Sequence, residues 1–468
     1  MYMQMKGKAM VNRRGFLGLA ASFGACGFSG CAGFPSVTST RSPNGQLRLG
    51  CIGCGAQGSS DIESIATHRR IEMAAFCDVD LAMLDKLRTK YPKARFYQNW
   101  REMLDREQLD AALVATPDHS HCEIMSEVLR RGLNLYAEKP LCRSFEECRQ
   151  LESLAASSGK VTQLGTQIAA WECDRHTAAI LQSGEIGKVR KVWLFSNSGY
   201  YAKLLPREWP LTPAPAPETL DWKGWLASAP YRPYVPKHYH SFVWRVWRDF
   251  GSGWLGDMGS HLFSPVWIGM GLGRTLPLSA RATVFDCGWN AEMKRQFLPL
   301  YSHVTWQFPG VKATDMKPFE VEWCDGPSGG AVPKEFLPTG KTEEIAGNKA
   351  DMAGLSAEFL PPARFGELAA KTPIGALPVQ GRVVEGTDGW LISTHFNQPP
   401  VTLTKDGRPK PLTLPFLEPV PSHYHEFVDC CLDGGKARSD FGWTTKLTDW
   451  VLLGRKAVDN PGQEVRMG

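Results

Sequence analysis

Residues 47–58 read LRLGCIGCGAQG, and this stretch decides the fold. A short run rich in apolar residues, typical of a buried strand, leads into Gly53, Gly55 and Gly58, which have the spacing G-x-G-x-x-G. In this motif the first glycine permits a tight turn, the second lets the backbone approach a pyrophosphate, and the third lets the helix pack closely on its strand. The stretch therefore predicts a dinucleotide-binding strand, turn and helix.

An acidic residue follows at the distance that this motif requires. Asp78 comes twenty residues after Gly58 and closes a second apolar run, Ile71–Cys77. A carboxylate there accepts hydrogen bonds from both ribose hydroxyls of NAD, whereas the additional phosphate of NADP would meet like charge. The pyrophosphate would lie against the unpaired N–H groups at the start of the helix. The sequence therefore favours NAD over NADP as the cofactor.

Short apolar runs alternate with helical patterns from residue 47 to residue 165. The runs that we interpret as strands are Leu47–Ile52, Ile71–Cys77, Ala94–Tyr97, Ala111–Ala115, Leu133–Ala137 and Val161–Leu164. Helical periodicity fills most of the gaps, as in Leu81–Tyr91 and Cys122–Arg131. Strands and helices in alternation build a doubly wound parallel sheet. We therefore predict an α/β protein with an NAD-binding Rossmann domain over residues 47–165.

Residues 166–468 show a different pattern and predict a second, α+β domain. A helix at about Glu172–Ser183 is followed by the strand Val189–Ser196. Later runs that are typical of a largely antiparallel open sheet are Ala280–Asp286, His303–Phe308, Phe319–Cys324 and Gly389–Ser393, and two closing helices are expected at Ser422–Leu432 and Thr444–Val458. Residues 327–381 contain several glycine and proline breaks and receive no assignment.

An aromatic insertion is expected at about residues 200–253. Its large side chains are Trp209, Trp222, Trp225, Trp244, Trp247, Tyr231, Tyr234 and Tyr239, with Trp254 directly after it. Flat apolar faces stack on the C–H faces of sugars, and Tyr and Trp also donate hydrogen bonds. We expect most of these residues to belong to a core or a subunit contact, and a few to line a saccharide cleft.

The first 31 residues are expected to be an export signal. Arg13 and Arg14 precede an uncharged stretch, Gly15–Gly30, and the pattern resembles a twin-arginine signal. A membrane-spanning helix needs about 20 apolar residues, so this stretch is short for one. Phe28–Cys31 resembles a lipoprotein cleavage box with Cys31 acylated, and the alternative is an ordinary cleaved signal with an incidental cysteine. After the tether 32–46, we expect a folded body that is periplasmic or anchored on the extracytoplasmic side of the membrane.

Composition excludes several other classes of protein. Of 468 residues, 43% are hydrophobic and 22% are charged, which is typical of a globular protein of more than one domain. Four of the 53 basic residues lie in the first fourteen positions, so the rest of the chain nearly balances its 48 acidic residues and offers no basic tract for nucleic acid. The 13 cysteines are scattered, and Cys51 and Cys54 share a C-x-x-C spacing only because of the glycine turn. We predict no metal site.

Polar residues follow the fourth and fifth predicted strands, at the sheet edge where such folds bind ligands. Residues 115–121 read ATPDHSH, and Glu138-Lys139-Pro140 comes after the fifth strand. A lysine at this edge can stabilise the alkoxide-like charge that grows on a substrate oxygen as hydride leaves the carbon. The alternative is that Lys139 is a surface residue beside a turn-forming proline.

A third segment supplies a candidate base. Asp257 and His261 are four residues apart on a predicted amphipathic helix that opens with Gly251 and runs to about Trp267, so they share a face. A histidine can take a hydroxyl proton near neutral pH, and a carboxylate one turn away can orient it and raise its basicity. The alternative is that Asp257 caps the helix and His261 satisfies a buried polar neighbour.

Together these segments resemble the Gfo/Idh/MocA family, which includes glucose–fructose oxidoreductase and inositol dehydrogenase. The likeness extends over nearly all of residues 47–462, including the closing stretch that starts with HYHEF at residue 423. It implies that Lys139, Asp257 and His261 act on a sugar or polyol hydroxyl beside the nicotinamide, and that Lys139–Pro140 is a cis peptide. It also implies a homo-oligomer with paired open sheets. The cofactor-binding residues that we predict are Gly53, Gly55, Ala56, Gln57, Gly58, Asp78, Thr116, Pro117, His121, Glu138, Lys139 and Gln167.

Two departures from the family pattern leave the substrate open. Ser264 stands where many members have an aspartate, and residues 165–171 read GTQIAAW where an arginine is common. The main hypothesis is an oxidoreductase with tightly held, recycled NAD that takes hydride from a sugar hydroxyl. One alternative is an NAD-dependent glycosidase that works by transient oxidation and elimination. Another is a saccharide-binding lipoprotein without chemistry.

Overall fold

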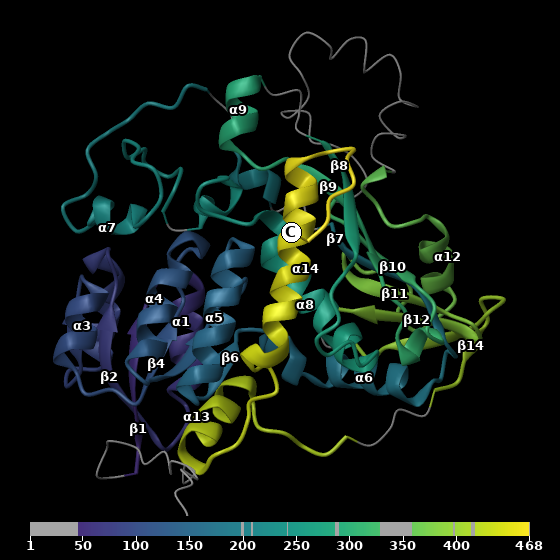
Figure 1. Ribbon diagram of the computed structural model, residues 1–468, viewed down its shortest axis with the longest axis horizontal. Helices are drawn as coiled ribbons and strands as arrows, with labels where there is room; N and C mark the ends of the chain where they lie inside the picture. Colours follow the sequence, from purple (N-terminus) through teal and green to yellow (C-terminus); the bar gives the residue numbers. More distant parts are fainter. Residues whose placement is uncertain are drawn as a thin grey trace, which may run out of the picture. The chain divides into compact units, whose positions relative to one another are not determined.

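A computed structural model of the protein describes residues 45–197, 201–206, 209–240, 242–285, 290–327, 358–395, 398–412 and 417–467. The predicted export signal, Cys31 and nearly all of the tether lie outside the described residues. The described chain forms two sheets with helices packed on them (Figure 1).

The first sheet has six strands in the order β3-β2-β1-β4-β5-β6, and all of its pairings are parallel. Its strands are β1 (Leu47–Ile52), β2 (Ile71–Cys77), β3 (Arg95–Tyr97), β4 (Ala111–Val114), β5 (Asn134–Ala137) and β6 (Thr162–Leu164). The helical segments between them are α1 (Ala56–Ile65), η1 (Leu81–Leu84), α2 (Asp85–Lys90), α3 (Trp100–Arg106), α4 (Asp118–Arg130) and α5 (Phe145–Ser158). The predicted doubly wound Rossmann sheet is confirmed.

The turn from β1 to α1 needs glycine at two positions. Gly53 has a φ of +85°, and a Cβ there would lie 2.6 Å from the carbonyl oxygen of Ala115. A Cβ on Gly58 would lie 2.0 Å from the carbonyl oxygen of Gly53, so no side chain fits between α1 and the turn. The helix consequently starts close to the end of the strand, with Gly55 as its N-cap residue.

The second sheet has eight strands in the order β14-β13-β12-β11-β7-β10-β9-β8. The pairing of β7 with β10 is parallel, and the other pairings are antiparallel. Its strands are β7 (Val189–Ser196), β8 (Ser279–Phe285), β9 (Tyr301–Phe308), β10 (Phe319–Cys324), β11 (Gln380–Gly386), β12 (Gly389–Thr394), β13 (Val401–Thr404) and β14 (Pro409–Lys410). This confirms the predicted, largely antiparallel second sheet, although the sequence analysis missed β11, β13 and β14.

The remaining helical segments are η2 (Gln167–Ala170), α6 (Glu172–Ser183), α8 (Gly253–Gly269), α9 (Ala291–Gln296), η5 (Lys312–Thr314), α12 (Arg364–Ala370), α13 (His423–Asp433) and α14 (Phe441–Asp459). Helices α6, α8 and α14 contribute to the large core with one face of the second sheet, where the rings of Trp306 and Trp450 lie 4.6 Å apart. Helix α12 packs near the sheet through Phe365, whose ring is 5.0 Å from that of Trp193.

The last two helices return to the first domain. Phe427 and Val428 of α13 belong to the same core cluster as Leu49 of β1, and the Tyr424 hydroxyl donates a 2.8 Å hydrogen bond to Asp61 of α1. Leu452 of α14 belongs to the core on the other side of the first sheet. In Figure 1, α14 runs between the helices of the first domain and the second sheet.

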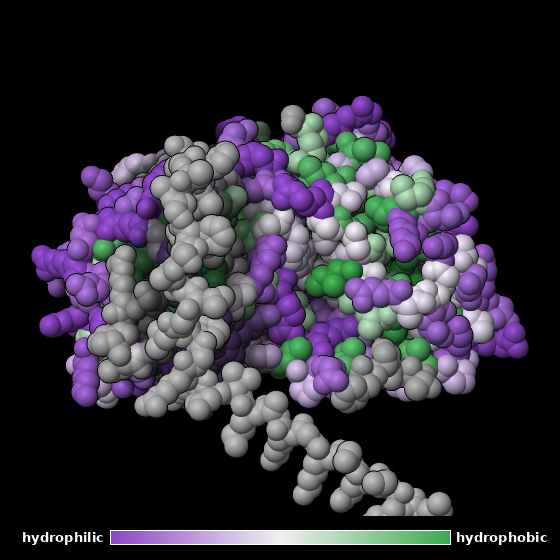
Figure 2. Space-filling model, turned by 60° about the horizontal axis from the view of Figure 1, so that its bottom comes forward, coloured by the Kyte–Doolittle hydropathy of each residue, from purple (hydrophilic) through white to green (hydrophobic). Residues whose placement is uncertain are grey.

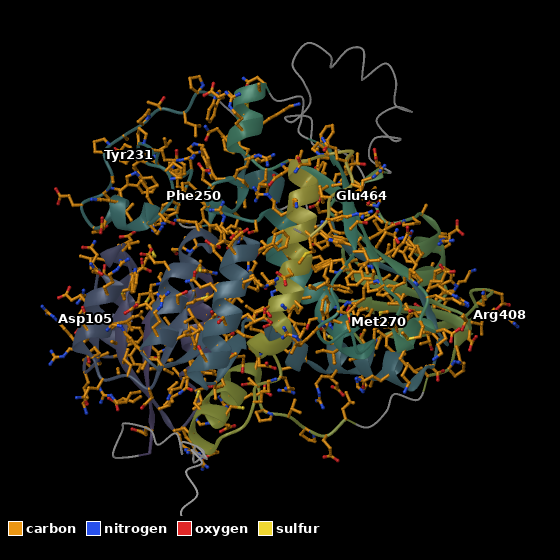
Figure 3. The ribbon with its side chains drawn as sticks, in the orientation of Figure 1. Asp105, Tyr231, Phe250, Met270, Arg408 and Glu464 are labelled. Atoms are coloured by element: carbon orange, nitrogen blue, oxygen red, sulfur yellow. The ribbon has the colours of Figure 1, made fainter. Side chains whose placement is uncertain are left out.

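The aromatic insertion links β7 to α8 and contains η3 (Tyr201–Leu204), α7 (Trp222–Leu226) and η4 (Val243–Val246). Most of its large side chains pack in a core, as expected from the sequence; the rings of Trp225 and Phe250 lie 4.8 Å apart. Figure 3 shows Phe250 toward the middle of the molecule and Tyr231, which is 79% exposed, at the outer rim.

The insertion is fastened to the loop after β2 by backbone hydrogen bonds. The N–H of Leu81 donates to the carbonyl oxygen of Thr219 at 2.9 Å, and the N–H of Asp221 donates to that of Val79 at 2.8 Å. These bonds place the insertion over the carboxyl edge of the first sheet.

On the face shown in Figure 2, hydrophilic residues surround separate small groups of hydrophobic ones. Among the described residues, none of the helices combines the length and the hydropathy that a membrane crossing requires.

Candidate active site

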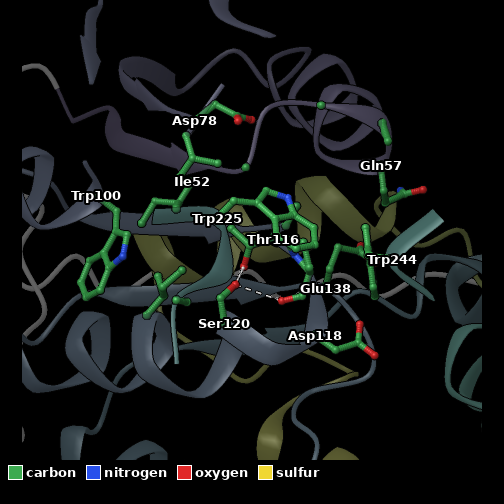
Figure 4. A pocket seen from close by; sticks show the side chains of 18 of the residues that line it. Ile52, Gln57, Asp78, Trp100, Thr116, Asp118, Ser120, Glu138, Trp225 and Trp244 are labelled. Carbon is green, nitrogen blue, oxygen red and sulfur yellow. Dashed lines mark hydrogen bonds between the residues drawn. The ribbon is translucent and has the colours of Figure 1, made fainter. Parts of the chain in front are cut away.

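A cleft of about 990 Å³ lies at the carboxyl ends of β1, β2, β4 and β5, beneath the aromatic insertion. It is elongated. In Figure 4, Trp100 and Asp78 lie toward one end, Gln57 and Trp244 lie toward the other, and Trp225 lies between them. Because ligands of open α/β sheets bind at this edge, the cleft is the natural place for a dinucleotide.

The glycine turn forms one wall of this cleft. Gly53, Gly55, Ala56 and Gln57 all line it, and they bring the start of α1 to the ligand. The first N–H groups of a helix point outward without partners in the helix, so they suit the phosphates of a dinucleotide. Gly58 lies behind the turn and allows the close packing of α1.

Asp78 lies at the end of β2, lines the cleft and is 8% exposed. Its two carboxylate oxygens accept hydrogen bonds from the backbone N–H groups of Cys54 at 2.8 Å and Asp80 at 2.9 Å. These bonds fix the carboxylate beside the glycine turn. Burial raises the pKa of Asp78, although both N–H groups favour the charged form. Asp80 in turn contacts His240 of the insertion, with Nε2 and Oδ2 3.0 Å apart.

Residues of the segment after β4 have two roles. Some line the cleft, and others contact backbone carbonyl oxygens. Thr116 and Pro117 line the cleft, and the Ser120 hydroxyl donates to the Thr116 hydroxyl at 2.8 Å (Figure 4). His121 is not among the lining residues: its Nδ1 lies 2.9 Å from the carbonyl oxygen of Pro140, and its Nε2 lies 2.6 Å from that of Thr116. The structure therefore places His121 as a brace between two loops of the site rather than at the predicted cofactor surface.

Lys139 forms an ion pair with Asp257 across the two domains. Its Nζ lies 2.8 Å from Asp257 Oδ1, and Arg245 Nε lies 3.3 Å from the same oxygen. Lys139 follows β5 and is 9% exposed, which excludes the alternative of a surface lysine. Burial alone would lower the pKa of Lys139, but the charges of Asp257 and Glu138 raise it. Lys139 and Arg245 together outweigh burial and hold the pKa of Asp257 well below its usual range. The peptide between Lys139 and Pro140 is cis, as predicted.

His261 lies on the wall of an adjoining cleft of about 800 Å³, which Asp257 and Lys139 also line. Burial, followed by the charge of Lys139, lowers the pKa of His261 well below its usual value, and the opposing effect of Asp257 is too small to compensate. The imidazole is therefore neutral at pH 7, and burial and the Lys139 charge oppose its protonation.

Asp257 has a different immediate partner from the one that we predicted. Helix α8 begins at Gly253, so Asp257 lies in its second turn and does not cap it. Its carboxylate binds Lys139 and Arg245, whereas we expected it to orient His261. Two cations within reach of one oxygen attract the carboxylate more strongly than a neutral imidazole does.

Glu138 and Gln167 lie at the floor of the site. Glu138 lines the cofactor cleft, and its Oε1 accepts a hydrogen bond from Gln167 Nε2. Burial and the nearby carboxylate of Asp61 raise the pKa of Glu138 to about 8. Asp61 Oδ1 accepts 2.8 Å hydrogen bonds from Gln57 Nε2 and from the hydroxyl of Tyr424. Gln167 thus contacts a cleft residue without forming part of the cleft wall itself.

The sequence analysis missed three polar side chains of the adjoining cleft: Arg245, Gln380 and His395. Arg245 is a cation within a run of aromatic residues, and its guanidinium lies 4.2 Å from the centre of the Trp244 ring. His395 directly follows β12, a strand that was predicted. A polar residue at the end of a predicted strand is a signal that could have drawn attention to His395.

The sequence matches two profiles of one family. Residues 47–166 match "Oxidoreductase family, NAD-binding Rossmann fold", and residues 174–288 match "Oxidoreductase family, C-terminal alpha/beta domain", both of Gfo/Idh/MocA. The chain belongs to the Gfo/Idh/MocA family. Together the two matches account for half of the sequence and cover the glycine turn, Lys139 and the Asp257–His261 helix.

Curated relatives of this Gfo/Idh/MocA protein match it over 123 residues only. An alpha-N-acetylgalactosaminidase of Shewanella oneidensis is 29% identical, and a glycosyl hydrolase family 109 protein of Shewanella sp. strain ANA-3 is 30% identical. In both cases the match covers 24% of this chain and 27% of the relative, so the chain spans about a quarter of the length of these relatives.

Solved structures share the fold over 90% of this chain. The WlbA dehydrogenase of Bordetella pertussis, in complex with NADH and UDP-GlcNAcA, has a TM-score of 0.57 at 14% identity and is covered to 99%. The aldose-aldose oxidoreductase of Caulobacter crescentus, complexed with glycerol, has a TM-score of 0.55 at 13% identity and is covered completely. At this level of identity the likeness concerns the fold alone.

NAD, the cofactor of this family, fits the residues that are present. The glycine turn admits no side chain at Gly53 or Gly58, which leaves the start of α1 open to phosphates. Asp78 sits beside the turn, where a ribose would lie, and the cleft continues from there to Lys139. Gly53, Gly55, Ala56 and Asp78 would hold the dinucleotide so that its nicotinamide lies at the Lys139 end.

Proposed function

We propose that this protein oxidises one hydroxyl group of a sugar or sugar derivative with NAD and returns the hydride to a second substrate while the cofactor stays bound. The observation that carries the proposal is the ion pair of Lys139 and Asp257, 2.8 Å apart, on the same cleft wall as His261 and at one end of the dinucleotide cleft. These are an ammonium donor and a neutral base beside the expected position of the nicotinamide.

Lys139, His261 and Asp257 have separate roles in the proposed reaction. NAD supplies the hydride acceptor when bound. Lys139 donates a hydrogen bond to the substrate oxygen and stabilises the negative charge that develops on it. His261 takes the hydroxyl proton. Burial and the charge of Lys139 oppose its protonation, and the negative charge that develops on the substrate oxygen offsets that positive charge. Asp257 keeps Lys139 charged and correctly placed, because its carboxylate binds the ammonium group directly.

The aromatic insertion supports retention of the cofactor, because it covers the dinucleotide cleft. Gly224, Trp225, Ala227, His240 and Trp244 all line the dinucleotide cleft, although they lie far from its glycine turn in the sequence. The insertion is fastened by backbone hydrogen bonds to the loop after β2. A dinucleotide beneath it would have to displace this segment in order to leave.

The proposal is tested with protein purified without added cofactor. We expect its absorbance spectrum to show bound nucleotide, and we expect the NADH band to appear when glucose, galactose or N-acetylgalactosamine is added. A later addition of an aldose should remove the band without release of nucleotide into the filtrate. Protein that contains no nucleotide, or bound NAD that no member of a broad panel of sugars and polyols reduces, would contradict the proposal.

A second candidate is an NAD-dependent glycosidase, in which oxidation of the sugar is transient. Two observations favour it: the relatives named as an alpha-N-acetylgalactosaminidase and family 109 hydrolases, and a second imidazole, His395, in the substrate cleft. Release of nitrophenol from an aryl N-acetylgalactosaminide over many turnovers, without added NAD, would favour this candidate over the first.

The place of action is part of the same proposal. We infer an exported protein that takes up NAD in the cytoplasm, folds, and crosses the membrane by the twin-arginine route, with Cys31 as the site of acylation. Replacing Arg13 and Arg14 with lysine should retain the protein in the cytoplasmic fraction. Replacing Cys31 with serine should release it from membranes, and a variant that stays membrane-bound would contradict acylation at this residue.

A further inference from the structure

The substrate cleft contains a second histidine that the proposed oxidation does not use. His395 follows β12 and is 3% exposed. Its ring centre lies 5.6 Å from that of His261, and the two planes are inclined by 49°. Both imidazoles line the cleft of about 800 Å³ that also contains Lys139 and Asp257. One substrate molecule in this cleft would therefore face two imidazoles.

The backbone around His395 is held firmly. The His395 N–H donates to the carbonyl oxygen of Gln380 at 3.1 Å, and Gln380 Nε2 donates to the Ser196 hydroxyl at 2.7 Å. Arg382 Nη2 donates to the carbonyl oxygen of Thr394 at 3.3 Å. These contacts fix the backbone from which the His395 side chain extends.

Arg382 is itself fixed by a buried ion pair. Its Nη1 lies 2.7 Å from Asp174 Oδ1, and both side chains are at most 1% exposed. The charged groups that act on the His395 ring are Arg382, Lys139 and Asp257. Burial, with the two cations, lowers the pKa of His395 to about 3, so this imidazole too is neutral at pH 7. Two neutral bases beside one ammonium group are more than removal of a single hydroxyl proton requires.

We propose that His395 is a second proton acceptor, which removes the hydrogen on the carbon next to the one that is oxidised. The inference rests on the proposed function. Imidazoles with centres 5.6 Å apart can reach the oxygen on one ring carbon and the hydrogen on the next, because adjacent carbons are only about 1.5 Å apart.

The proton and electron balance is simple. Oxidation transfers a hydride from carbon to NAD⁺ and the hydroxyl proton to His261, which leaves a ketone. His395 then takes a proton from the neighbouring carbon; the C–H electron pair forms a C=C bond, and the carbonyl π electrons move to oxygen as an enolate. Lys139 donates a hydrogen bond to that oxygen. The negative charge also offsets the ammonium charge that disfavours protonation of His395. Return of the proton from His395 regenerates the ketone.

The test uses a ring ketone, so that no hydride transfer is needed. The NAD⁺-loaded protein is mixed with scyllo-inosose in D₂O, at a concentration that saturates the change in tryptophan fluorescence, and loss of the hydrogens beside the carbonyl is followed by proton NMR. We expect exchange above the spontaneous rate, and an exchange about 100-fold slower in His395→Gln. His303→Gln, on the half-buried face of β9, is the matched control and should exchange like the wild type.

Several outcomes would overturn the assignment. Wild-type protein that gives no exchange at saturation would do so, as would a His395→Gln variant that exchanges like the wild type while its melting temperature is unchanged. Failure of the proposed function is a separate result, because it appears as the absence of NADH formation from sugars and polyols. In His395→Gln, the exchange rate should fall at least about tenfold further than the rate of NADH formation does, and an equal loss of both reactions would assign His395 to the oxidation step or to folding.

Discussion

The dinucleotide cleft and the adjoining cleft of about 800 Å³ form the two ends of one site, and they are built in different ways. We call them the dinucleotide end and the substrate end. At the dinucleotide end, the polar groups expected to meet the phosphates and the ribose come from the backbone of the glycine turn, the start of α1 and a carboxylate whose oxygens are held by two N–H groups. At the substrate end the surface is made of side chains from separate elements, among them Lys139 after β5, Asp257 and His261 on α8, and His395 after β12. A short stretch of sequence defines the first end, whereas only the folded chain assembles the second.

This difference determines what a substitution does. A backbone surface fails when a side chain is added, because there is no space for one. A side-chain surface fails when a functional group is removed, because no neighbour can replace it.

Removal of the Lys139 ammonium group should have the largest effect on the substrate end. We expect Lys139→Ala to reduce sugar-dependent formation of bound NADH by about 10³-fold, because the developing charge on the substrate oxygen loses its donor. Rapid-mixing absorbance measures the rate. Lys86→Ala, an exposed lysine on α2, is the control and should be unchanged. Bound nucleotide should persist in Lys139→Ala, and a rate within threefold of the wild type would remove Lys139 from the mechanism.

Addition of one methyl group should damage the dinucleotide end. In Gly53→Ala the new Cβ would lie 2.6 Å from the carbonyl oxygen of Ala115, in addition to the strain of a φ of +85°. We expect NAD to bind roughly 10- to 100-fold more weakly, since strained residues cost about 1–3 kcal/mol. Gly159→Ala is the matched control: its φ is +62°, and no atom lies within 4 Å of the added Cβ. Nucleotide content after purification distinguishes the two, and equal content would argue against a backbone surface.

The aromatic insertion is fastened to the first domain by a contact with Asp80. Loss of this contact should have a smaller effect on the retention of NAD. His240→Ala removes a 3.0 Å contact that fastens the insertion over the ribose end of the cleft. We expect bound NAD to dissociate a few times faster, because a typical hydrogen bond contributes only about 0.5–1.5 kcal/mol net. Dissociation is measured by dilution into an excess of a dehydrogenase that consumes free NAD. The neighbouring His238→Ala should dissociate at the wild-type rate.

The smallest expected effect concerns the floor of the site and depends on pH. The pKa of Glu138 is about 8 in the folded protein, above its value in the unfolded chain, so the folded state binds more protons between these values. The free energy of unfolding therefore falls as pH rises through this window. In Glu138→Gln the free energy of unfolding does not fall for this reason, because a glutamine side chain does not ionise. We expect its melting temperature, relative to the wild type, to be higher at about pH 9 than at about pH 5.

The exposed Glu63→Gln on α1 serves as the control for this measurement and should show no such difference. A relative melting temperature of Glu138→Gln that is the same at both pH values would mean that this carboxyl does not take up a proton on folding.

The sequence predicted the dinucleotide end better than the substrate end. Strands β1, β2, β7 and β10 have the predicted bounds, because apolar runs between glycine or polar breaks mark buried strands clearly. Lys139, Asp257 and His261 were identified, and the structure brings all three to one cleft. Their mutual contacts could not be predicted, because the partner of Asp257 depends on how two domains meet. No local pattern in the sequence shows that the carboxylate of Asp257 binds Lys139 and Arg245 rather than His261.

Strand β11 and His395 were not predicted for the same reason: their roles depend on contacts between distant parts of the sequence. Strand β11 lies between β7 and β12, yet its sequence, QGRVVEG, places a charged residue at Arg382, which is fully buried. That arginine pairs with Asp174 on α6, a partner more than 200 positions away that a scan for apolar runs does not reveal. His395 was missed because its importance depends on its distance from His261 on another element.

The return of α13 and α14 to the first domain has a consequence for how the chain is made. Phe427 and Val428 complete one core beside β1, and Phe441 and Leu452 complete the other. While the ribosome is still translating the middle of the message, the nucleotide domain therefore lacks part of its interior. Domains usually fold in order as they emerge during synthesis. In this chain the nucleotide domain has to wait for a segment that is made much later, so its interior is completed only after the second sheet has been synthesised.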